Sequence, residues 1–348
     1  MKKTLIRKYK ILITLCVCVI ASLLYYFFFT PLSKSKETEY VYIDSDDTAD
    51  SVFTKISHFS GKHGMNALRT LVRHSSYYNH VREGRYAIEP SEGAFVVFRH
   101  LKSGSQSPVR LTIPSVRTID RLCGELSKRM MFDSLAIYKT LTDNDSCKQY
   151  GYDTTTIACM FIPNTYEVYW NMPVDKFLER MKKESDNFWN TDRTYKARHM
   201  GLTPNEVITL ASIVDEETSV DEEKPKVAGM YYNRLKLRNS EYPNGMPLQA
   251  DPTIKFALKK FELKRIYNNM LSVNSPYNTY RNAGLPPGPI RIPTVAGIDA
   301  VLNYTRHNYL YMCAKEDFSG THNFAATYQE HQQNAARYSA ALNKRGIK

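Results

Sequence analysis

The chain has 348 residues, of which 43% are hydrophobic and 24% charged, and its formal net charge is +12. At roughly 150 residues per domain, this length predicts about two domains and excludes a miniprotein held together only by disulfides. The 15 glycines and 16 prolines exclude a collagen-like chain, and the 25 tyrosines and 15 phenylalanines argue against a largely disordered one.

A basic N-terminus precedes a long apolar run. Residues 1–10 carry five lysines and arginines, and residues 11–29 carry no charge. At about 1.5 Å per residue, such a run approaches the thickness of a hydrocarbon core. The positive-inside rule then predicts a cytoplasmic tail at 1–10, a single transmembrane anchor at 11–30 and an extracytoplasmic remainder. A cleaved signal peptide is the alternative, but its apolar region usually spans only about 7–15 residues and ends in small side chains.

The rest of the chain gives no sign of nucleic-acid or metal binding. Its 42 basic and 35 acidic residues are interspersed, so no dense basic patch is predicted and no nucleic-acid partner is expected. The nine histidines form no H-E-x-x-H pattern, so neither a metal nor another cofactor is predicted. The cysteines outside the apolar run form no C-x-x-C pair, and both disulfides and buried thiols remain open for Cys123, Cys147, Cys159 and Cys313.

The predicted extracytoplasmic part divides into three segments that differ in polarity and in hydrophobic pattern. Residues 31–50 are polar and are predicted to be a linker. Residues 51–150 alternate between helical and strand patterns and are predicted to form a small α/β module. Residues 151–348 are predicted to form a larger mixed α/β domain, which makes the fold class α+β. Within these segments the patterns predict helices at 51–74, 91–101, 116–131 and 173–189, and strands at 84–88, 109–113 and 167–170.

The most informative helix begins at Thr203-Pro204. Thr203 is predicted to be the N-cap, Pro204 suits the first turn, and Glu206 completes a capping box. The helix is expected to run into three consecutive acids, Asp215, Glu216 and Glu217.

Glu217 differs from its two neighbours by the helix face that it shares. It continues an apolar stripe formed by Leu210, Ile213 and Val214. Partial desolvation there raises the pKa of a carboxyl, so that it holds a proton at neutral pH and donates it to a glycosidic oxygen. A solvated helix end is the alternative reading of the same three acids.

Downstream, a second helix is predicted at 226–237, followed by segments of mixed character. Asp251 precedes Pro252 and is interpreted as an N-cap rather than a catalytic acid. The segments 276–280 and 284–290 are predicted to be stiff loops rich in tyrosine, asparagine and proline, which suit either a sugar-binding surface or a structural turn.

Several pieces of sequence occur in the order typical of one known family. The chain resembles the MltG/YceG-like endolytic murein transglycosylases, with Gly84-Arg85-Tyr86 as the clearest match in the outer N-terminal part. The other matching pieces are the apolar N-terminal run, FIPNTY (161–166), ASIVDEET (211–218), KVA with YNRL (226–235), LQADPT (248–253), YNTY (277–280), GLPPGPI (284–290) and THNF (321–324).

The resemblance implies an architecture and a reaction. It implies a LysM-like module at 51–150, a YceG-like catalytic domain at 151–348, and non-hydrolytic cleavage of the MurNAc–GlcNAc β-1,4 bond within glycan strands to give 1,6-anhydroMurNAc ends. The family's catalytic glutamate falls on Glu217, although Asp215 replaces the usual first glutamate and Asn164 stands where the family has an acid. Expected substrate-binding residues are Tyr166, Asn233, Gln249, Tyr277, Asn278, Tyr280 and His322.

Partners and location follow from the same resemblance. The expected partners are peptidoglycan glycan strands, the inner membrane of a bacterial cell and cell-wall synthases. The alternative function is a non-catalytic murein-binding scaffold of the cell-wall synthesis machinery.

Overall fold

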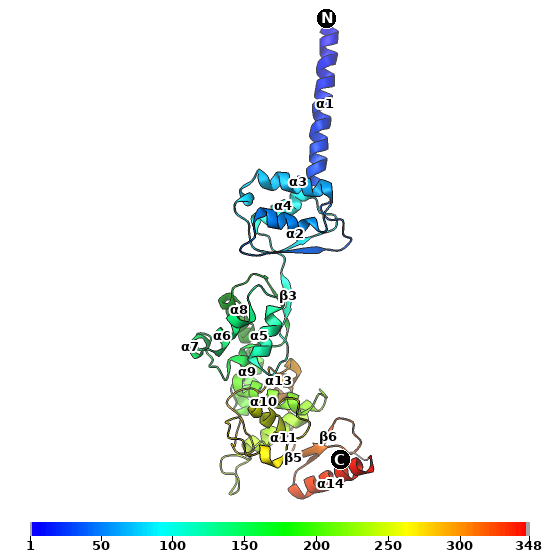
Figure 1. The fold of residues 1–348 in the computed structure, drawn as a ribbon. Coiled ribbons are helices and arrows are strands. Elements are labelled where there is room, and N and C mark those ends of the chain that lie inside the picture. Colours follow the sequence, from blue (N-terminus) through cyan, green and yellow to red (C-terminus); the bar gives the residue numbers. More distant parts are fainter. Residues whose placement is uncertain (1, 346–348) are drawn as a thin grey trace. The chain divides into compact units, whose positions relative to one another are not determined.

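A computed structural model describes residues 2–345 of the chain. Met1 of the predicted tail and residues 346–348 of the predicted catalytic domain lie outside the described residues. The chain divides into two compact units. Unit 1 comprises 1–111, 129–131 and 166–172, and unit 2 comprises 112–128, 132–165 and 173–348. Both units mix helices with two-stranded sheets, as the α+β prediction expects (Figure 1).

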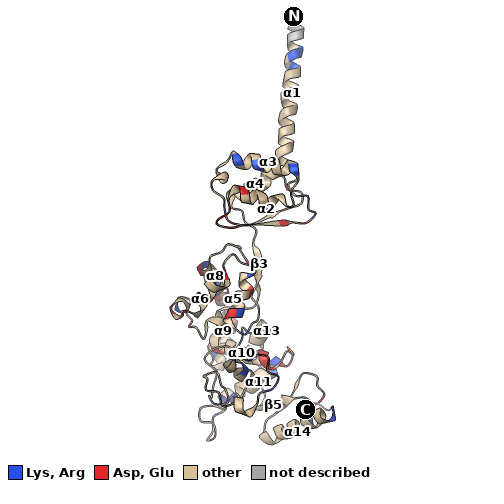
Figure 2. Ribbon diagram, viewed as in Figure 1, with Lys and Arg blue, Asp and Glu red and all other residues tan. Residues whose placement is uncertain are grey.

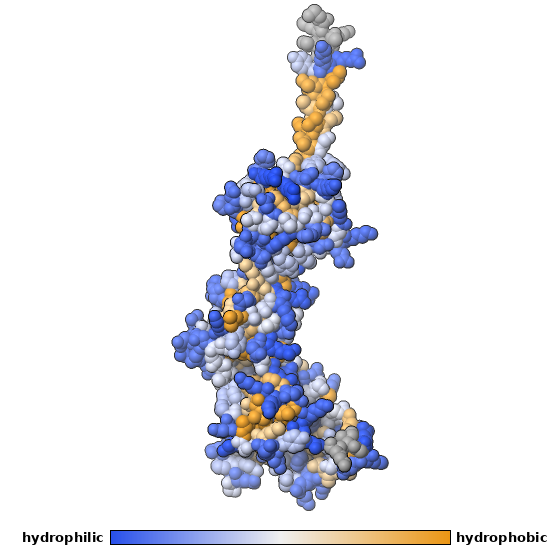
Figure 3. Space-filling model, in the orientation of Figure 1, coloured by the Kyte–Doolittle hydropathy of each residue, from blue (hydrophilic) through white to orange (hydrophobic). Residues whose placement is uncertain are grey.

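Unit 1 begins with the long helix α1 (Lys2–Phe28). Its segment Ile6–Phe28 is long and apolar enough to cross a membrane, and none of its most apolar window is buried against protein. Figure 3 shows this apolar surface along the helix, and Figure 2 shows basic residues near its N-terminal end. At the other end, the hydroxyl of Tyr26 donates to the carbonyl of His63, and Phe28 contacts Phe95.

The remainder of unit 1 packs helices on one antiparallel ribbon. Strand β1 (Glu39–Ile43) pairs with β2 (Gly84–Ile88), so the predicted strand at 84–88 is confirmed. The helices are α2 (Ala49–Ser57), α3 (Lys62–Arg73) and α4 (Ala94–Ser103), with a short 3-10 turn, η1 (Ser76–Tyr78), before β2. Their apolar faces and the inward residues of both strands form one buried core.

The segment that follows α1 differs from its prediction. The segment 31–50 is not a plain linker, because Leu32, Val41 and Ile43 are buried in the core of unit 1. Its acids belong to the turn and first residues that lead into α2, where Thr48 and Ser51 form a capping box. The main boundary between the compact units falls at 111–112, and the predicted boundary between the module and the catalytic domain at residue 150 stays a prediction.

The chain passes from one unit to the other within strand β3 (Val109–Thr112) and again within strand β4 (Thr165–Val168). These two strands pair with each other. Unit 2 then contains one further sheet, in which β5 (Tyr311–Ala314) pairs antiparallel with β6 (His322–Ala325). Its helices are α5 (Ile119–Ser127), α6 (Ser134–Thr142), α7 (Asn144–Lys148), α8 (Val174–Phe188), α9 (Thr191–Met200), α10 (Pro204–Glu217), α11 (Lys224–Lys236), α12 (Asp251–Leu258), α13 (Val295–Leu302) and α14 (Tyr328–Lys344), with 3-10 turns η2 (Ile157–Met160) and η3 (Asn268–Met270).

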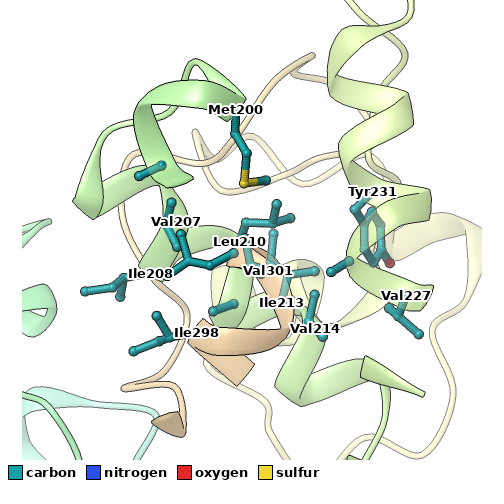
Figure 4. Packing of buried hydrophobic residues seen from close by; sticks show 14 of the residues in the cluster. Met200, Val207, Ile208, Leu210, Ile213, Val214, Val227, Tyr231, Ile298 and Val301 are labelled. Atoms are coloured by element: carbon teal, nitrogen blue, oxygen red, sulfur yellow. The ribbon is translucent and has the colours of Figure 1, made fainter. Parts of the chain in front are cut away.

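Helix α10 lies at the centre of the core of unit 2. Every residue from Val207 to Val214 is buried. Figure 4 shows Ile213 and Val214 packing toward Val227 and Tyr231 of α11, while Ile298 of α13 packs on the other side. A helix with apolar contacts on several sides has a fixed axis and rotation. The side chains at its C-terminal end are therefore held in defined directions.

Candidate active site

The N-terminus of α10 is fixed by the capping box that the sequence predicts. The Thr203 hydroxyl accepts from the Glu206 amide, and the Glu206 carboxylate accepts from the Thr203 amide over 2.7 Å. Such a cap stabilises a helix by about 1 kcal/mol. With this end capped and the middle buried, the last residue of the helix, Glu217, has a fixed position.

The first acid of the run, Asp215, has a structural role. Its side chain is only 2% exposed and lies 2.8 Å from the Lys224 ammonium. It also accepts a 2.6 Å hydrogen bond from the Thr294 amide. Asp215 therefore fastens α10 to the starts of α11 and α13, and it has neither the exposure nor the free oxygen needed to meet a substrate.

The second acid, Glu216, is occupied by two arginines. Arg117 donates to both of its carboxylate oxygens at 2.8 Å, and Arg291 donates to Oε1 at 3.0 Å. Forked contacts of this kind stabilise the charged carboxylate. Both oxygens of Glu216 are thus engaged by arginines, so this side chain is not placed for proton transfer.

The third acid, Glu217, has no ion pair among the residues that the structure describes. Its Oε1 accepts a 2.6 Å hydrogen bond from the hydroxyl of Tyr231. Burial raises the pKa of Glu217, and the charge of Asp251 raises it further, against the opposing hydrogen bond from Tyr231. The partial negative charge at the C-terminus of a helix acts in the same direction as burial. These effects favour a protonated carboxyl poised for donation.

Glu217 lines a small polar cavity of about 270 Å³. Four predicted site residues meet there: Glu217, Gln249, Tyr280 and His322. In sequence they span more than 100 residues, from Glu217 to His322, and the packing of α10, α11, α12 and the β5–β6 ribbon brings them together. The other lining residues are Met230, Tyr231, Arg234, Asp251, Met312, Cys313 and Ala314.

A second carboxylate, Asp251, also lines this cavity. Its Oδ1 accepts a 2.6 Å hydrogen bond from the Tyr280 hydroxyl, and this contact together with burial raises the pKa of Tyr280. The prediction that Asp251 caps α12 is wrong, because Ala250 occupies the N-cap and Asp251 is the first helical residue. Its side chain is therefore left to face the cavity instead of the helix amides.

The backbone before α12 is bent to form the cavity wall. Gln249 has φ 52°, in the left-handed region that few residues other than glycine adopt. Its amide donates to the Thr279 carbonyl over 3.0 Å, and the next amide, of Ala250, donates to the Thr279 hydroxyl over 3.0 Å. The pieces 248–253 and 277–280 thus form one hydrogen-bonded unit that carries Gln249, Asp251 and Tyr280.

His322 is oriented by a buried acid, Glu223. The Glu223 carboxylate accepts from the His322 backbone amide over 2.6 Å and lies 3.0 Å from Nδ1 of the ring. An ionised carboxylate only accepts, so Nδ1 is the donor and Nε2 is the nitrogen left for other contacts. Glu223 precedes α11, which links the position of His322 to the helix that carries Tyr231.

Arg234 also lines the cavity and connects the elements around it. It donates to the carbonyls of Leu310 over 2.6 Å and Leu248 over 2.6 Å, so it joins α11 to the β5–β6 ribbon and to the segment before α12. Burial lowers the pKa of Arg234. Its positive charge near Glu217 partly offsets the effect of burial on that carboxyl.

Four other predicted site residues lie outside this cavity. Asn233 donates to the carbonyls of His307 and Tyr309, and Asn278 is fully buried and donates to the carbonyls of Leu271 and Val273. Tyr277 packs on Phe256 and lines a different cavity. Tyr166 is buried in β4 within unit 1.

Sequence reasoning missed Tyr231, Arg234, Asp251 and Glu223 as members of the site. A signal existed for the first two, because Val227, Met230, Tyr231 and Arg234 share one face of α11, and a tyrosine and an arginine on a buried face need polar partners. Asp251 and Glu223 had no local signal, since their partners lie far away in sequence.

The cysteines form no disulfides, and the described residues show no metal-ligand cluster. All six cysteines are free thiols, and Cys123, Cys147 and Cys159 are buried. Cys313 is half-buried and lines the cavity, where burial raises its pKa and keeps it protonated. Among residues 2–345, no group of three or more His, Cys, Asp or Glu side chains is placed to hold a metal ion.

Comparison with known proteins identifies the family. The YceG-like family model matches residues 41–337. The chain belongs to the YceG-like family. The match covers most of unit 1 and nearly all of unit 2, including every residue that lines the Glu217 cavity.

Curated relatives cover part of the chain. A protein named endolytic murein transglycosylase from Bacillus subtilis is 31% identical over 172 residues, which are 49% of this chain and 45% of that protein. A protein of the same name from Streptococcus pneumoniae is 27% identical over 293 residues, which are 75% of this chain and 51% of that protein. The chain therefore spans about half the length of the curated relatives it matches.

A solved structure supports the fold. The crystal structure of a yceG-like protein from Listeria monocytogenes matches with a TM-score of 0.55 and 23% identity, over 86% of this chain and 99% of that one. At this identity the likeness speaks for the fold alone.

Proposed function

We propose that this YceG-like chain is a membrane-anchored endolytic lytic transglycosylase of peptidoglycan. It cleaves the MurNAc–GlcNAc β-1,4 bond within glycan strands, leaves 1,6-anhydroMurNAc ends and so trims or terminates strands. The observation that carries the proposal is Glu217, a partly buried carboxyl without a cationic partner among the described residues, hydrogen-bonded by Tyr231 at the wall of a polar cavity.

Glu217 serves as acid and then as base in the proposed reaction. Protonated Glu217 gives its proton to the glycosidic oxygen, and the bond from that oxygen to the anomeric carbon breaks. The resulting carboxylate takes the proton of the sugar's C6 hydroxyl as that oxygen bonds to the anomeric carbon. The 1,6-anhydro ring closes, and Glu217 is protonated again. No water is consumed, and no second catalytic carboxylate is required.

The neighbours of Glu217 suit both halves of this cycle. Burial favours the protonated form before cleavage, while the Tyr231 hydroxyl and the nearby charges of Arg234 and His322 stabilise the carboxylate that forms after proton donation. A pKa balanced by opposing contacts allows one group to give and retake a proton.

The presence of Asp251, a second carboxylate in the cavity, makes ordinary hydrolysis the competing reaction. In a hydrolase a second carboxylate activates water or attacks the sugar directly. The Tyr280 hydroxyl already occupies one oxygen of Asp251, which favours a role in holding the cavity wall or the substrate. The two reactions differ in product, because hydrolysis leaves a reducing end and the proposed reaction leaves an anhydro end.

Membrane attachment and wall binding belong to the same proposal. Helix α1 is the inner-membrane anchor, with the N-terminus cytoplasmic and the chain after α1 outside. The LysM-like glycan-binding module is the region 51–150, which includes most of α2 and all of α3, α4 and β2 of unit 1, and cell-wall synthases are the partners that would supply nascent strands. The length and composition of α1 and the separate core of unit 1 support this part.

Mass spectrometry of products from purified murein tests the proposal. The wild-type chain should release fragments with 1,6-anhydroMurNAc ends, and Glu217→Gln should abolish them. Glu222→Gln, at an exposed acid outside the cavity, is the matched control and should stay active. Reducing ends in place of anhydro ends would establish hydrolysis instead, and murein binding with no new ends would leave the scaffold function.

A further inference from the structure

A second and larger cavity in unit 2 takes no part in the proposed reaction. Its volume is about 710 Å³, and Glu217 is not among its lining residues. Its walls come from the segment leading into α5, from α6, from the turn before η2, from the end of α12 and from the loop at 289–292. All of these segments belong to unit 2.

Positive charge gathers in this cavity. Its lining contains four basic side chains, Arg117, Arg121, Lys259 and Arg291, and one acidic side chain, Asp120. With Glu216 behind the arginine pair counted as a second acid, the site keeps an excess of two positive charges. A concave site of this sign attracts anions.

One wall of the cavity already binds a carboxylate. Arg117 grips Glu216 with two 2.8 Å hydrogen bonds, and Arg291 adds a third at 3.0 Å. The Ser115 hydroxyl accepts from Nη2 of Arg291 over 2.8 Å and fixes that guanidinium. These contacts occupy the charges of this arginine pair, so they are not the cations that remain for a ligand.

Arg121 and Lys259 are those cations. Both are exposed, both line the cavity, and neither has an ion pair within the part of the chain that the structure describes. Lys259 has φ 53° and ends α12 in a left-handed cap, where its amide donates to the carbonyls of Lys255 and Phe256. Its backbone position is thus fixed while its ammonium stays available.

Aromatic rings supply an apolar surface beside these charges. Phe256 and Tyr277 lie with ring centroids 4.7 Å apart, and Phe261 lies 5.6 Å from the guanidinium carbon of Arg117. A ligand that combines aliphatic groups with carboxylates matches this lining better than a neutral sugar does. Murein strands carry such groups as peptides on MurNAc.

We propose that this cavity binds the carboxylates of the peptides carried by the glycan strand, through Arg121 and Lys259. The inference rests on the proposed function for its substrate. Under this proposal the chain recognises the peptide as well as the glycan. Asp251 of the Glu217 cavity and Phe256 of the larger cavity lie on the same short helix, α12, and Lys259 caps the C-terminus of that helix, so one element connects the Glu217 cavity to one of the two cations.

Binding measurements on the full-length Glu217→Gln chain test this without turnover. The two ligands are murein oligosaccharides with their peptides and the same oligosaccharides after enzymatic removal of the peptides. The peptide-free strand keeps a lactyl carboxylate on each MurNAc, so weaker binding after peptide removal assigns the interaction to the peptide rather than to any carboxylate. We expect the peptide-bearing ligand to bind about tenfold more tightly, as charge-assisted contacts allow.

Charge removal identifies the residues. Adding Arg121→Ala with Lys259→Ala should reduce binding of the peptide-bearing ligand to the peptide-free value and leave peptide-free binding unchanged. Arg198→Ala with Lys260→Ala makes the same change of charge at exposed residues outside the lining and should leave both affinities unchanged. Equal binding of the two ligands, or equal weakening of both by the cavity variant, would overturn the inference. An absence of anhydro products from the wild type would instead refute the proposed function, whatever the binding result.

Discussion

The hydroxyl of Tyr231 lies 2.6 Å from Oε1 of Glu217 and donates its hydrogen to that carboxylate oxygen. This contact joins the end of α10 to the middle of α11, and among residues 2–345 it is the hydrogen bond that opposes burial in setting the pKa of Glu217. The acid strength of the site therefore depends in part on one neutral partner, which a conservative substitution can remove.

Tyr231→Phe should move the pH dependence of cleavage. The hydrogen bond favours the charged carboxylate, so its loss raises the pKa of Glu217 and shifts the basic limb of kcat/KM upward by about one pH unit. The measurement is the pH profile of anhydro-product release. Tyr232→Phe removes a hydroxyl that donates to the Met200 carbonyl instead, and its profile should match the wild type. Unshifted limbs in both variants would contradict this account of Glu217.

Glu217→Gln should raise the stability of the folded protein at neutral pH. A pKa raised on folding means that the folded state binds more protons than the unfolded chain between the ordinary and the raised value. Stability then falls as pH rises through that window, and the uncharged glutamine removes this loss. We expect a gain in Tm of roughly 2–4 °C at pH 8 and a smaller gain at pH 4, by thermal unfolding. A variant less stable than the wild type at pH 8 would show that Glu217 is better accommodated as a carboxylate.

Asp215→Ala should destabilise the protein strongly. It leaves the buried Lys224 ammonium without its 2.8 Å partner, and breaking a buried ion pair costs about 3–5 kcal/mol. Denaturant unfolding measures the loss. Asp221→Ala removes the other partner of Lys224, which is exposed, and should cost about 1 kcal/mol or less. Similar losses from both variants would contradict the burial argument.

Glu223→Gln should slow cleavage through His322. The glutamine side chain has one acceptor oxygen, so it cannot accept hydrogen bonds from both the His322 backbone N–H and the His322 ring as the two carboxylate oxygens of Glu223 do. His322 then loses its fixed orientation at the cavity. We expect kcat to fall about tenfold with little change in KM, since loss of such a supporting contact costs about 10–100-fold at comparable sites. Glu222→Gln, one residue earlier and exposed, provides the comparison for turnover and folding. A fall in kcat that does not exceed that of Glu222→Gln would remove the positioning role of Glu223.

Local chemistry explains which features the sequence reveals. The capping box at Thr203 and Glu206, the strand at 84–88 and the apolar stripe of α10 depend on neighbours within a few residues, and all three are present. The strand at 39–43 does carry a local sign, the aromatic and β-branched residues of EYVYI, but the polar residues around it favoured a linker and its partner strand lies about 45 residues away.

The cavity shows the same limit. Glu217 stands out because its own helix supplies the apolar stripe. Asp251 does not, because its partner Tyr280 is 29 residues away and the preceding turn depends on Thr279. Asn278 resembles a binding residue in sequence, but its side-chain amide donates its hydrogen bonds to backbone carbonyls of its own loop. Residue type and order identify the participants of such a site, and only packing determines which of them face it.

The pairing of the first two acids, Asp215 with Lys224 and Glu216 with Arg117 and Arg291, has a consequence for salt dependence. Each acid is neutralised at short range, so neither adds an unbalanced charge beside Glu217. Contacts within a few ångströms and partly out of water are screened far less than charges separated by a Debye length of about 8 Å. The pH optimum of the chain should accordingly stay nearly constant as ionic strength changes, even where salt weakens the binding of the charged strand itself.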